Sequence, residues 1–566
     1  MLLSNLSLLT TAPGGVGRLR ELILTLAVQG KLVPQDPRDE PASELLKKIR
    51  AEKDRLIAEG KIKRDKLLAE IAEEQQPFPL PRAWKWVRAL DICALITDGD
   101  HQPPPKADTG VPFLVIGDVR TGEVLLRGAS RFVPESYFEE IDWGKKPCLG
   151  DVLYTTVGSF GIPVPVVQQQ RFCFQRHIAL FRPAAVELQS FLALALRTKL
   201  AFRQAEKGAT GIAQKTVPLS ALRDLVLPLP PLAEQSRIVT RVEELMRLCD
   251  ALEAKGRLEA AQHAQLVSTL LGTLTQSETP KQLADNWQRT ATHFDLLLDR
   301  PEAVDALEQT IRQLAVRGLL VPQDPQDEPA SELLHKIRTE KDRLIAKGKI
   351  KRDKPLPPIA EEEQPFELPQ GWTWVRLNSL LQKIGAGSTP LGGREVYVPS
   401  GVKFLRSQNV WDDGLRLTGV AFIKPATHTK MAGTVVVAND LLFNITGASI
   451  GRCAVVPSDF DEANVSQHVT IVRTVLPALN EFLHKVLVSR HVQQAVMDVQ
   501  VGVSREGLSI AKLGQFVIPL PPLDEQSRIV TRVASLRRLC ADLRQRLAAS
   551  QSTQALLAEA LAREVI

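Results

Sequence analysis

The sequence contains few cysteines and no long apolar run. Its six cysteines in 566 residues are far apart, with no Cys-x-x-Cys and no Cys/His spacing that would build a tetrahedral zinc site. No stretch approaches the roughly 18 consecutive apolar residues that a membrane-spanning helix requires, and no positive charge precedes the apolar N-terminal residues, as it would in a signal peptide. We therefore expect a soluble, cytoplasmic chain that holds no structural metal ion.

The familiar sequence signatures of catalysis are also missing. There is no Gly-x-x-x-x-Gly-Lys-Ser/Thr phosphate loop, and Gly385–Gly387 is followed by Ser-Thr-Pro, which indicates a turn rather than a nucleotide-binding loop. No Asn-Pro-Pro-aromatic sequence of the kind expected in an amino-group methyltransferase occurs. Asp250, Glu253 and Lys255 resemble a nuclease set only in residue type, because they lie on an expected helix whose charges should face solvent. The sequence thus predicts a non-catalytic chain with no cofactor of its own.

Length and composition predict a folded, multidomain protein. Hydrophobic residues make up 44% and charged residues 24%, as in ordinary globular proteins, and 566 residues exceed the size of one compact domain several-fold. Lys and Arg number 71 against 65 Asp and Glu, a net charge of +6 that is too weak by itself to indicate a polyanionic partner. Whether a polyanionic partner is expected therefore depends on where the charges lie along the chain.

A long internal repeat divides the chain. Residues 26–66 return 288 positions later with six of 41 positions changed, and PLPPLAEQSRIVTRV from Pro228 returns from Pro519 as PLPPLDEQSRIVTRV. These two near-identical frames bracket two inserts, residues 78–227 and 366–518, that share only scattered residues. Simple duplication would let frames and inserts drift alike. The contrast instead favours frames that meet a constant partner and inserts that meet two different targets.

Five segments follow from this pattern. The first is an N-terminal helical region, residues 1–77, followed by the first insert as a recognition domain, residues 78–227. A central helical region, residues 228–365, contains a coiled-coil spacer and the repeat of the N-terminal region. The second insert is a recognition domain, residues 366–518, and a C-terminal coiled-coil helix follows, residues 519–566.

Each frame contains a long helix with a heptad pattern. Pro230 and Pro231 suit a helix start, and acidic Glu234 follows in the first turn, where the helix dipole favours it. Each helix should run for about 35–45 residues, or roughly 50–65 Å. Each apolar seam could pack on its own globular domain, but the matched pair favours one antiparallel coiled coil between the two helices. The seam residues are Ile238, Val242, Leu245, Cys249 and Leu252 in the first helix, and Ile529, Val533, Leu536, Cys540 and Leu543 in the second.

The repeated segment upstream predicts a further helix. Pro41 is placed for an early helical position, apolar residues at helical spacing make a stripe, and Gly60 follows as a stop. A dense face of mixed charge extends from Lys47 to Arg55. Such a face is usually only solvated, but its near-verbatim recurrence leaves a docking role open.

The inserts have a different texture. They consist of short β-branched runs between Gly and Pro, followed by helical stretches. We expect an α+β protein in which each insert is a mixed α/β domain and the two are related by a pseudo-two-fold axis. The predicted strands include those at residues 111–119, 151–158 and 177–183 in the first insert, and at 441–447 and 468–474 in the second.

All of the net positive charge lies in the inserts. The first has 18 Lys and Arg against 14 Asp and Glu, and the second has 14 against 11, which leaves the frames with a net charge of −1. A modest positive charge confined to the two divergent domains is the electrostatic footprint expected for binding a polyanion.

Side chains suited to reading bases gather on the loops of the inserts. Arg fits guanine and Asn or Gln fits adenine in the major groove, so these residue types on loops favour DNA readout. Each one alone is more often a polar residue that stabilises a turn or a strand edge, so the grouping carries the prediction. The candidates are Lys106, Arg120, Gln175, Arg176, His177, Gln214 and Lys215 in the first insert, and Ser388, Thr389, Arg406, Ser407, Gln408, Asn409, Asn444, Thr446, Gln467 and His468 in the second.

Three features occur together over essentially the whole chain. They are the two Trp-x-Trp-Val segments from Trp84 and Trp372, the two divergent inserts, and the two PLPPL-x-Glu-Gln-Ser-Arg-Ile-Val segments that lead into long helices. In this combination the chain resembles the specificity subunit of type I restriction-modification enzymes. LVPQDP-x-DEPASELL-x-KI is similar to the subset of that family with an additional N-terminal region, and Ser388-Thr389-Pro390 and Asn444-Ile445-Thr446-Gly447 are similar to patterns in its recognition domains.

This resemblance implies a division of labour. Each insert would read one half of a bipartite, asymmetric site in double-stranded DNA, and the paired helices would fix the gap. Two methyltransferase subunits would dock on the chain and use S-adenosylmethionine to methylate a flipped adenine, and a nuclease and translocase subunit would use ATP and Mg²⁺. The chain itself would be non-catalytic and would not bind a membrane. A coiled-coil scaffold without sequence-specific DNA reading is the alternative.

Overall fold

Two compact units make up the chain. The computed structural model describes residues 6–64, 70–100, 104–119, 121–126, 129, 131–211, 214–501 and 507–564. Unit 1 comprises residues 1–259 and 551–566, and unit 2 comprises residues 260–550. Each unit contains one insert, and each of the two long helices contributes residues to both units.

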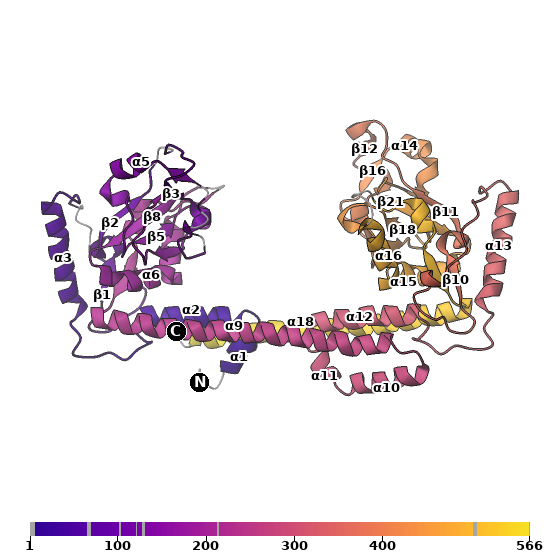
Figure 1. Cartoon of the computed structure of the whole chain (residues 1–566), viewed down its shortest axis with the longest axis horizontal. Helices are drawn as coiled ribbons and strands as arrows, with labels where there is room; N and C mark the ends of the chain where they lie inside the picture. The colour runs from indigo at the N-terminus through magenta and orange to yellow at the C-terminus, as the bar shows by residue number, and fades with distance from the viewer. Residues whose placement is uncertain are drawn as a thin grey trace. The chain divides into compact units, whose positions relative to one another are not determined.

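Unit 1 combines a domain of short sheets with a set of helices (Figure 1). Its helices are α1 (Leu6–Thr11), α2 (Gly15–Val28), α3 (Ala42–Ala58), α4 (Ala89–Ile92), α5 (Glu135–Glu140), α6 (Gln189–Arg197), α7 (Lys199–Gly208), α8 (Leu219–Arg223) and the start of α9 (Leu232–Thr275). Its strands are β1 (Lys85–Arg88), β2 (Cys93–Asp98), β3 (Val111–Leu114), β4 (Phe132–Val133), β5 (Val152–Thr155), β6 (Pro163–Pro165), β7 (Cys173–Phe174), β8 (Ile178–Pro183) and β9 (Val226–Leu229). The sheets have the strand orders β1-β9, β2-β8-β5-β6 and β4-β3-β7.

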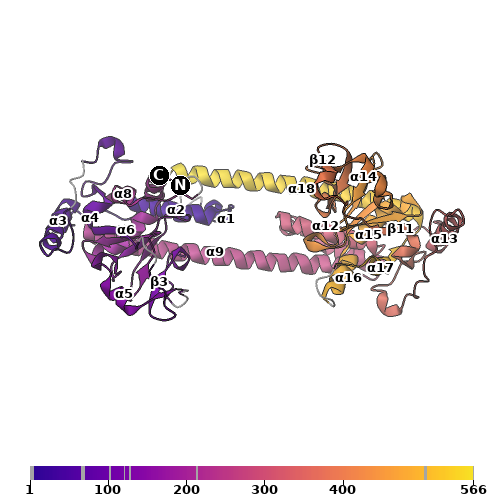
Figure 2. The same cartoon turned by 90° about the horizontal axis from the view of Figure 1, so that it is seen from above.

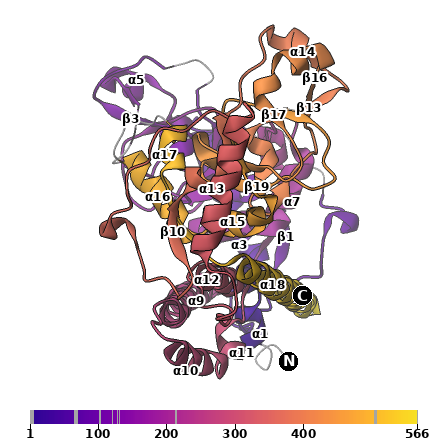
Figure 3. The same cartoon turned by 90° about the vertical axis from the view of Figure 1, so that its right-hand side faces the viewer.

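Unit 2 repeats this plan, with a five-stranded sheet in place of the three-stranded sheet of unit 1. This unit faces the viewer in Figure 3. Its helices are α10 (Pro280–Ala291), α11 (Phe294–Leu297), α12 (Pro301–Val316), α13 (Ala330–Ala346), α14 (Pro425–Lys430), α15 (Asn480–Leu487), α16 (Arg490–Val501), α17 (Ile510–Gly514) and most of α18 (Leu523–Glu564). Its strands are β10 (Thr373–Arg376), β11 (Leu381–Ala386), β12 (Tyr397–Val398), β13 (Val402–Leu405), β14 (Val410–Trp411), β15 (Gly414–Leu415), β16 (Ala421–Ile423), β17 (Val435–Val436), β18 (Leu441–Asn444), β19 (Cys453–Val455), β20 (Ala463–Val465), β21 (Val469–Thr474) and β22 (Val517–Leu520). The sheets have the orders β10-β22, β11-β21-β18-β19, β12-β16-β13-β20-β17 and β14-β15.

The predicted secondary structure is confirmed in both units. The five predicted strands are present as β3, β5, β8, β18 and β21, and the mixed α/β character of the inserts holds. The two long helices have 44 and 42 residues. Pro41 precedes α3, which buries Leu45, Ile49 and Leu56, and Gly60 follows it with a left-handed φ of 70°. Figure 1 shows α3 standing beside the sheets of unit 1 and α13 standing beside those of unit 2.

An antiparallel strand pair closes each insert at its base. In unit 1, β1 pairs with β9, so that Trp86 lies opposite Pro228. In unit 2, β10 pairs with β22, so that Trp374 lies opposite Pro519. The repeated Trp-x-Trp-Val and PLPP segments, distant in sequence, are therefore the two strands of one structure. This pairing holds the start and the end of each insert together on its frame.

A buried carboxylate joins the repeated segments of the frame in unit 1. Glu234, only 1% exposed, accepts a hydrogen bond from Trp84 Nε1 at 2.9 Å and from Gln35 Nε2 at 2.7 Å. Burial raises the pKa of Glu234, although both hydrogen bonds oppose that change. One turn further along α9, Arg237 forms an ion pair with Asp39 at 2.5 Å. The contacts tie the start of α9 to the segment between α2 and α3.

The frame of unit 2 contains the same network. Glu525 accepts hydrogen bonds from Trp372 Nε1 at 2.9 Å and from Gln323 Nε2 at 3.1 Å. Arg528 and Asp327 form the matching ion pair at 2.5 Å. A change at one of these positions would leave a buried polar group without its partner, which costs about 1–3 kcal/mol. The same internal contacts therefore recur in both repeated frames.

The seam of α9 packs on α2 within unit 1. Ile238, Val242 and Cys249 are buried in one apolar cluster with Ile23 and Ala27 of α2. Leu245 lies at the edge of that cluster and Leu252 is half-buried. Part of the α9 seam is therefore buried within unit 1, in a cluster that also contains residues of α2.

The seam of α18 packs on α12 within unit 2. Ile529, Val533 and Cys540 belong to one cluster with apolar residues of α12, and Leu536 and Leu543 pack against it. Figure 2 shows α12 between α18 and the end of α9 within unit 2. The second half of α9 contributes to the same cluster through Val267, Leu271 and Leu274. The seam residues of the two long helices thus belong to two clusters, each of which also contains apolar residues of a shorter helix.

An ion-pair cluster links α2 to α9 in unit 1. Arg20 of α2 lies 2.7 Å from Asp250 and 3.1 Å from Glu253 of α9. Both carboxylates are largely exposed, at 67% and 50% of their side chains, which agrees with the expectation that they face solvent. They serve as partners of Arg20 and form no acid cluster of their own.

The equivalent cluster in unit 2 has the opposite sign. Glu308, 288 positions after Arg20, lies on α12 and contacts Arg537 of α18 at 2.8 Å, Arg544 of α18 at 2.6 Å and Arg312 at 2.7 Å. Burial alone would raise the pKa of Glu308, but the three guanidinium groups outweigh it and lower the pKa to about 2. Because the signs are exchanged, pairing α2 with α18 or α12 with α9 would place like charges together. The inversion directs each short helix to its own long helix although the apolar seams are alike.

Glu308→Gln tests this cluster by its pH dependence. Because the folded pKa lies below the usual value of 4.5, the stabilisation is complete above pH 4.5 and is lost as the pH falls toward about 2. We expect the variant to lose about 2 kcal/mol of unfolding free energy at neutral pH, with the difference shrinking in acid. Urea titrations followed by helical circular dichroism measure both effects. Arg538→Gln, an exposed change on α18, is the matched control, and an equal loss at every pH would contradict the expected role.

Candidate nucleic-acid interface

The loops predicted as a binding site in the second insert converge at one end of the sheet β11-β21-β18-β19. Four backbone hydrogen bonds of 2.9–3.1 Å join them, from Gly387 N to Val469 O, from Ser388 N to Val465 O, from Ser466 N to Leu405 O and from Ile445 N to His468 O. The backbone just after β11 lies so close to β20 that a Cβ atom on Gly387 would be 1.9 Å from Val465 O. Glycine is therefore required at that position, and the loop ends form one continuous surface.

Most of the predicted side chains on this surface are accessible. Thr389 Oγ1 donates to Gln467 Oε1 at 3.1 Å, and Thr446 Oγ1 lies in a hydrogen bond 2.6 Å from His468 Nδ1. Thr446 is half-buried, as is Ser407. The exposed predicted residues are Ser388, Thr389, Arg406, Gln408, Gln467 and His468. The structure thus gathers side chains from four loops that are far apart in the sequence.

Two predicted residues are buried and hold the loops instead of facing outward. Asn409, 2% exposed, accepts from Arg406 N at 2.9 Å and donates to Arg416 O at 2.8 Å. Asn444, 0% exposed, donates to Ser407 O at 2.9 Å. Both side chains are buried and their Nδ2 groups are engaged in these loop contacts, so they present no accessible edge to a base. Both sidechains fix the position of the segment that carries Arg406 and Gln408.

The first insert builds the same surface from different residues. Gly99 follows β2 as Gly387 follows β11, and a Cβ atom there would lie 2.1 Å from Phe174 O. Thr156 N donates to His177 O at 3.0 Å, which matches the bond from Ile445 to His468. Asp118 accepts from Val115 N at 2.8 Å, as Asn409 accepts from Arg406 N. The loop scaffold is therefore shared, although the side chains displayed on it are not.

Three predicted residues of the first insert stand together on that scaffold. Gln175 and His177 are half-buried and Arg176 is exposed, at the turn before β8. Arg176 Nε donates to His177 Nε2 at 3.4 Å. Partial burial and the charge of Arg176 lower the pKa of His177, which favours the neutral ring as the acceptor of that bond.

The remaining predicted residues of the first insert are less concentrated. Gln214 and Lys215 are exposed beside the turn after β5, where Gly158 N donates to Lys215 O at 3.2 Å. Lys215 also pairs with Glu206 of α7 at 3.0 Å. Lys106 is exposed next to Ala107, whose N donates at 3.0 Å to Phe132 O at the start of β4. Arg120 lies outside the described residues.

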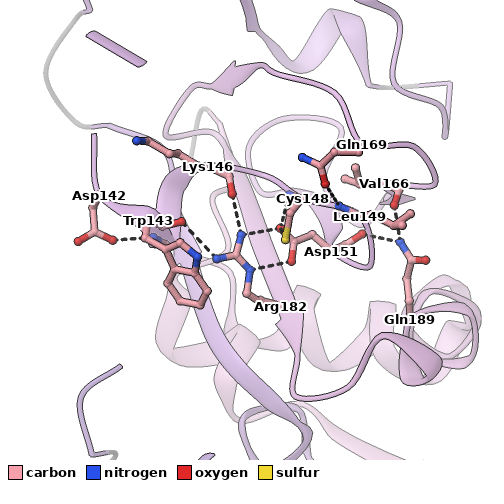
Figure 4. Close-up of polar contacts among 11 residues, drawn as sticks. Asp142, Trp143, Lys146, Cys148, Leu149, Asp151, Val166, Gln169, Arg182 and Gln189 are labelled. Atoms are coloured by element: carbon pink, nitrogen blue, oxygen red, sulfur yellow. Dashed lines mark hydrogen bonds and ion pairs between the residues drawn. The ribbon is translucent and has the colours of Figure 1, made fainter. Parts of the chain in front are cut away.

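A buried ion pair supports the strands that carry these loops (Figure 4). Arg182 of β8 donates to Asp151, just before β5, at 2.9 and 2.7 Å, and the two side chains are 7% and 1% exposed. The guanidinium also donates to the carbonyls of Trp143 at 3.2 Å and Lys146 at 2.7 Å, and it stacks on the Trp143 ring. Gln189 of α6 donates to the Asp151 carbonyl at 2.8 Å. This network fixes β5 and β8, whose ends hold the candidate residues.

The second insert contains the same support. Arg473 of β21 donates to Asp440, before β18, at 2.6 and 2.7 Å. Asp440 is 1% exposed, but the Arg473 side chain is 24% exposed. Asn480 stands in the place of Gln189 and accepts a hydrogen bond from Thr474 Oγ1 at 2.6 Å. The recurrence of this network identifies the two inserts as one fold despite their divergent sequences.

Sequence reasoning missed one feature of the surface. Trp411, at the end of β14, lies between Arg416 and Arg452, whose guanidinium carbons are 3.6 and 3.7 Å from the centroid of its ring. Arg452 comes 41 residues after Trp411, so no local pattern indicates the contact. Within the described ranges, no group of three or more His, Cys, Asp or Glu side chains could hold a metal ion, and no helix is long and apolar enough to cross a lipid bilayer.

Comparisons with known proteins identify relatives of this chain. Residues 81–263 and residues 369–550 each match the type I restriction modification DNA specificity domain. The EcoAI specificity subunit of Escherichia coli is 35% identical, over 97% of this chain and 93% of its own length, and the EcoEI specificity subunit of the same organism is 34% identical over the same shares. A chain from a solved structure of a type I restriction-modification system covers 86% of this chain and 99% of its own length, with 18% identity and a TM-score of 0.48.

The chain is a recognition protein with two α/β domains. Each domain is held by a repeated helical frame, and the two display different polar loops on the same backbone scaffold. The chain belongs to the family of type I restriction-modification specificity subunits. It is the non-catalytic DNA-recognition subunit of such a system, which confirms the predicted family and the predicted role as a DNA specificity subunit.

Proposed function

We propose that each insert reads one half of a bipartite, asymmetric site in double-stranded DNA. The observation that carries this proposal is the shared loop scaffold with different side chains on it. Where the second insert presents Arg406, Ser407 and Gln408, the first has Val115, Ile116 and Gly117, 291 positions earlier. Two readers of one geometry with different chemistry require two different half-sites.

The accessible predicted residues make the contacts. Exposed Arg and Gln side chains address base edges, whereas the buried Asn409 and Asn444 position the loop that carries Arg406 and Gln408. Arg120 remains a proposed contact. The other proposed contacts are Lys106, Gln175, Arg176, His177, Gln214 and Lys215 in the first insert, and Ser388, Thr389, Arg406, Ser407, Gln408, Thr446, Gln467 and His468 in the second.

The two frames dock two methyltransferase subunits, and the long helices set the length of the gap between the half-sites. Support comes from α3 and α13, which present the same charged surface twice, including exposed Arg50 and Arg338 and the matching ion pairs Lys48–Glu40 and Lys336–Glu328. The methyltransferase subunits supply S-adenosylmethionine chemistry, and a restriction and translocase subunit supplies steps that need ATP and Mg²⁺. The complex works in the cytoplasm, on chromosomal DNA.

Mapping of modified adenines in cells tests this function. The chain is expressed with its methyltransferase subunit, and genomic DNA is sequenced by a method that detects methyladenine. We expect a single asymmetric motif with two defined parts, a gap of fixed length and no sequence preference, and one modified adenine in each part. The matched control is the methyltransferase subunit without this chain. Modification without sequence preference would favour the scaffold alternative, and a continuous motif would contradict the two-reader proposal.

A further inference from the structure

Two arginines share the ring of Trp411 in the second insert. Trp411 Nε1 donates to Gln408 O at 2.8 Å, which fixes the orientation of the indole. The guanidinium carbons of Arg416 and Arg452 lie 3.6 and 3.7 Å from the ring centroid. Two planar groups so close to one centroid would overlap on the same face, so they lie on opposite faces. The indole is therefore the middle layer of an Arg–Trp–Arg stack.

The stack is part of the loop surface already described. Asn444 N, at the end of β18, donates to Arg452 O at 2.9 Å. Ile445 N, the next in the chain, donates to His468 O at 3.0 Å. Asn409 Nδ2 donates to Arg416 O at 2.8 Å. These bonds place the backbone of both arginines directly beside the loops that carry the candidate base-reading residues.

Two carboxylates lie near the stack, but neither forms a close ion pair with it; Asp412 Oδ1 instead accepts a hydrogen bond from Cys453 N at 3.1 Å. Arg416 reaches Asp413 only at 3.5 Å, and both of those side chains are more than half exposed, so the pair is weak. Among the described residues, Arg452 has no carboxylate within ion-pair distance. Two cations held on one ring repel each other and gain from a bound anion. Stacking occupies the faces of the guanidinium groups but leaves their N–H edges free, and those edges match phosphate oxygens.

The first insert has apolar residues at the equivalent positions. Arg416 N donates to Asn409 O, and Leu125 N donates to Asp118 O in the same way. Asn444 N donates to Arg452 O, and Thr155 N donates to Ile162 O. Leu125 and Ile162 therefore stand where Arg416 and Arg452 stand. The shared fold does not require the two arginines, which indicates a role specific to the second insert.

We propose that Arg416 and Arg452, held on the two faces of Trp411, bind phosphate groups of the DNA backbone beside the half-site of the second insert. The stack is a rigid anchor that sets the register of the duplex against Arg406, Gln408 and Gln467, and it contributes affinity without sequence preference. In the described part of the first insert, Leu125 and Ile162 take the places of the two arginines. This inference rests on the proposed DNA-reading function.

The test measures binding of the full chain to a fluorescent DNA duplex pool of random sequence over a range of salt concentrations. Each lost phosphate contact should lower the slope of log Kd against log salt by about 0.9. We expect Arg452→Gln to lower the slope by about 0.9 and the Arg416→Gln/Arg452→Gln double variant by about 1.8. Trp411→Phe keeps an aromatic face and should retain most of the slope, and Trp411→Ala should lose part of it. Arg490→Gln, an exposed change at the start of α16, is the charge-matched control.

The outcomes separate this inference from the proposed function. If the double variant keeps its melting temperature, binds DNA as the wild type does and shows the same salt slope, the proposed anchor is overturned. The proposed DNA-reading function is then unaffected. Loss of affinity for only the methylated motif, with an unchanged slope on random duplexes, would show that the stack reads bases and would also overturn the proposed anchor. A wild-type chain that binds neither random duplexes nor the motif would count against the proposed function itself.

Discussion

Exchanging the first insert for that of a relative changes one half of the methylated sequence and leaves the other half intact. The expected effect is large because each mismatched base pair in a recognition site costs about 1–3 kcal/mol, so the old site is lost once a few positions change. The structure places the junctions between β1 and α4 and between α8 and β9, because the β1–β9 pair belongs to the frame. Residues 89–225 are the segment to exchange, with the EcoAI specificity subunit as the donor.

The exchanged chain is expressed in cells with its methyltransferase subunit. Sequencing that detects methyladenine in the genomic DNA then gives the methylated motif. The matched control exchanges residues 377–516, between β10 and β22, and should change only the other half. The gap length should stay constant in both, since α9 and α18 are untouched. A change in both halves after a single exchange would mean that the inserts do not read independently. Near-complete loss of methylation by a folded chimera would contradict the modular interpretation as well.

The repeat in the sequence predicted the plan of the molecule well. The short apolar runs predicted the strands, because these runs are β-branched and bounded by Gly or Pro. The heptad pattern predicted both long helices. These are local patterns that depend on neighbouring residues. The partner of a heptad seam is not local, because α2 and α12 carry apolar faces that compete for the same stripe. Only the three-dimensional packing decides between a long helix and a short one.

The binding surface shows the same limit more sharply. Loop position and residue type selected Asn409 and Asn444 along with Arg406 and Gln408, but an amide that can read a base can equally cap a loop. Burial separates the two roles, and burial follows from contacts between segments far apart in the chain. The Trp411 stack escaped notice for the same reason. Glu234 was expected in the first turn because of the helix dipole, and the sequence did not indicate that Trp84, 150 residues earlier, makes it a buried acceptor.

The likeness of the inserts was also hidden in the sequence. Asp118 and Asn409 accept the same backbone hydrogen bond, and Gly99 and Gly387 make the same close approach, although the residues around them differ. Backbone geometry was retained at the positions that form loops, while the exposed residues between them diverged. That separation lets one fold be given new specificity without a new core, which is what a system with two readers requires.

Removing Asp151 should destabilise the first insert by about 3–5 kcal/mol. Asp151→Ala leaves the Arg182 guanidinium, only 7% exposed, as a buried charge with carbonyl partners but no anion. The matched variant Asp440→Ala should cost less, because the Arg473 side chain is 24% exposed and can turn toward water. Hydrogen exchange measured by mass spectrometry reports on each insert separately, through peptides from β5 and β8 or from β18 and β21.

The expected result is faster exchange confined to β5 and β8 in Asp151→Ala, together with loss of methylation at every site that depends on the first half-site. Arg182→Met in the same chain should recover much of the stability, because a buried pair replaced by apolar groups of similar volume is often neutral or stabilising. Recovered stability with recovered methylation would assign the ion pair a purely supporting role. Equal losses in Asp151→Ala and Asp440→Ala would contradict the link between burial and cost, since the two pairs differ chiefly in the exposure of the arginine.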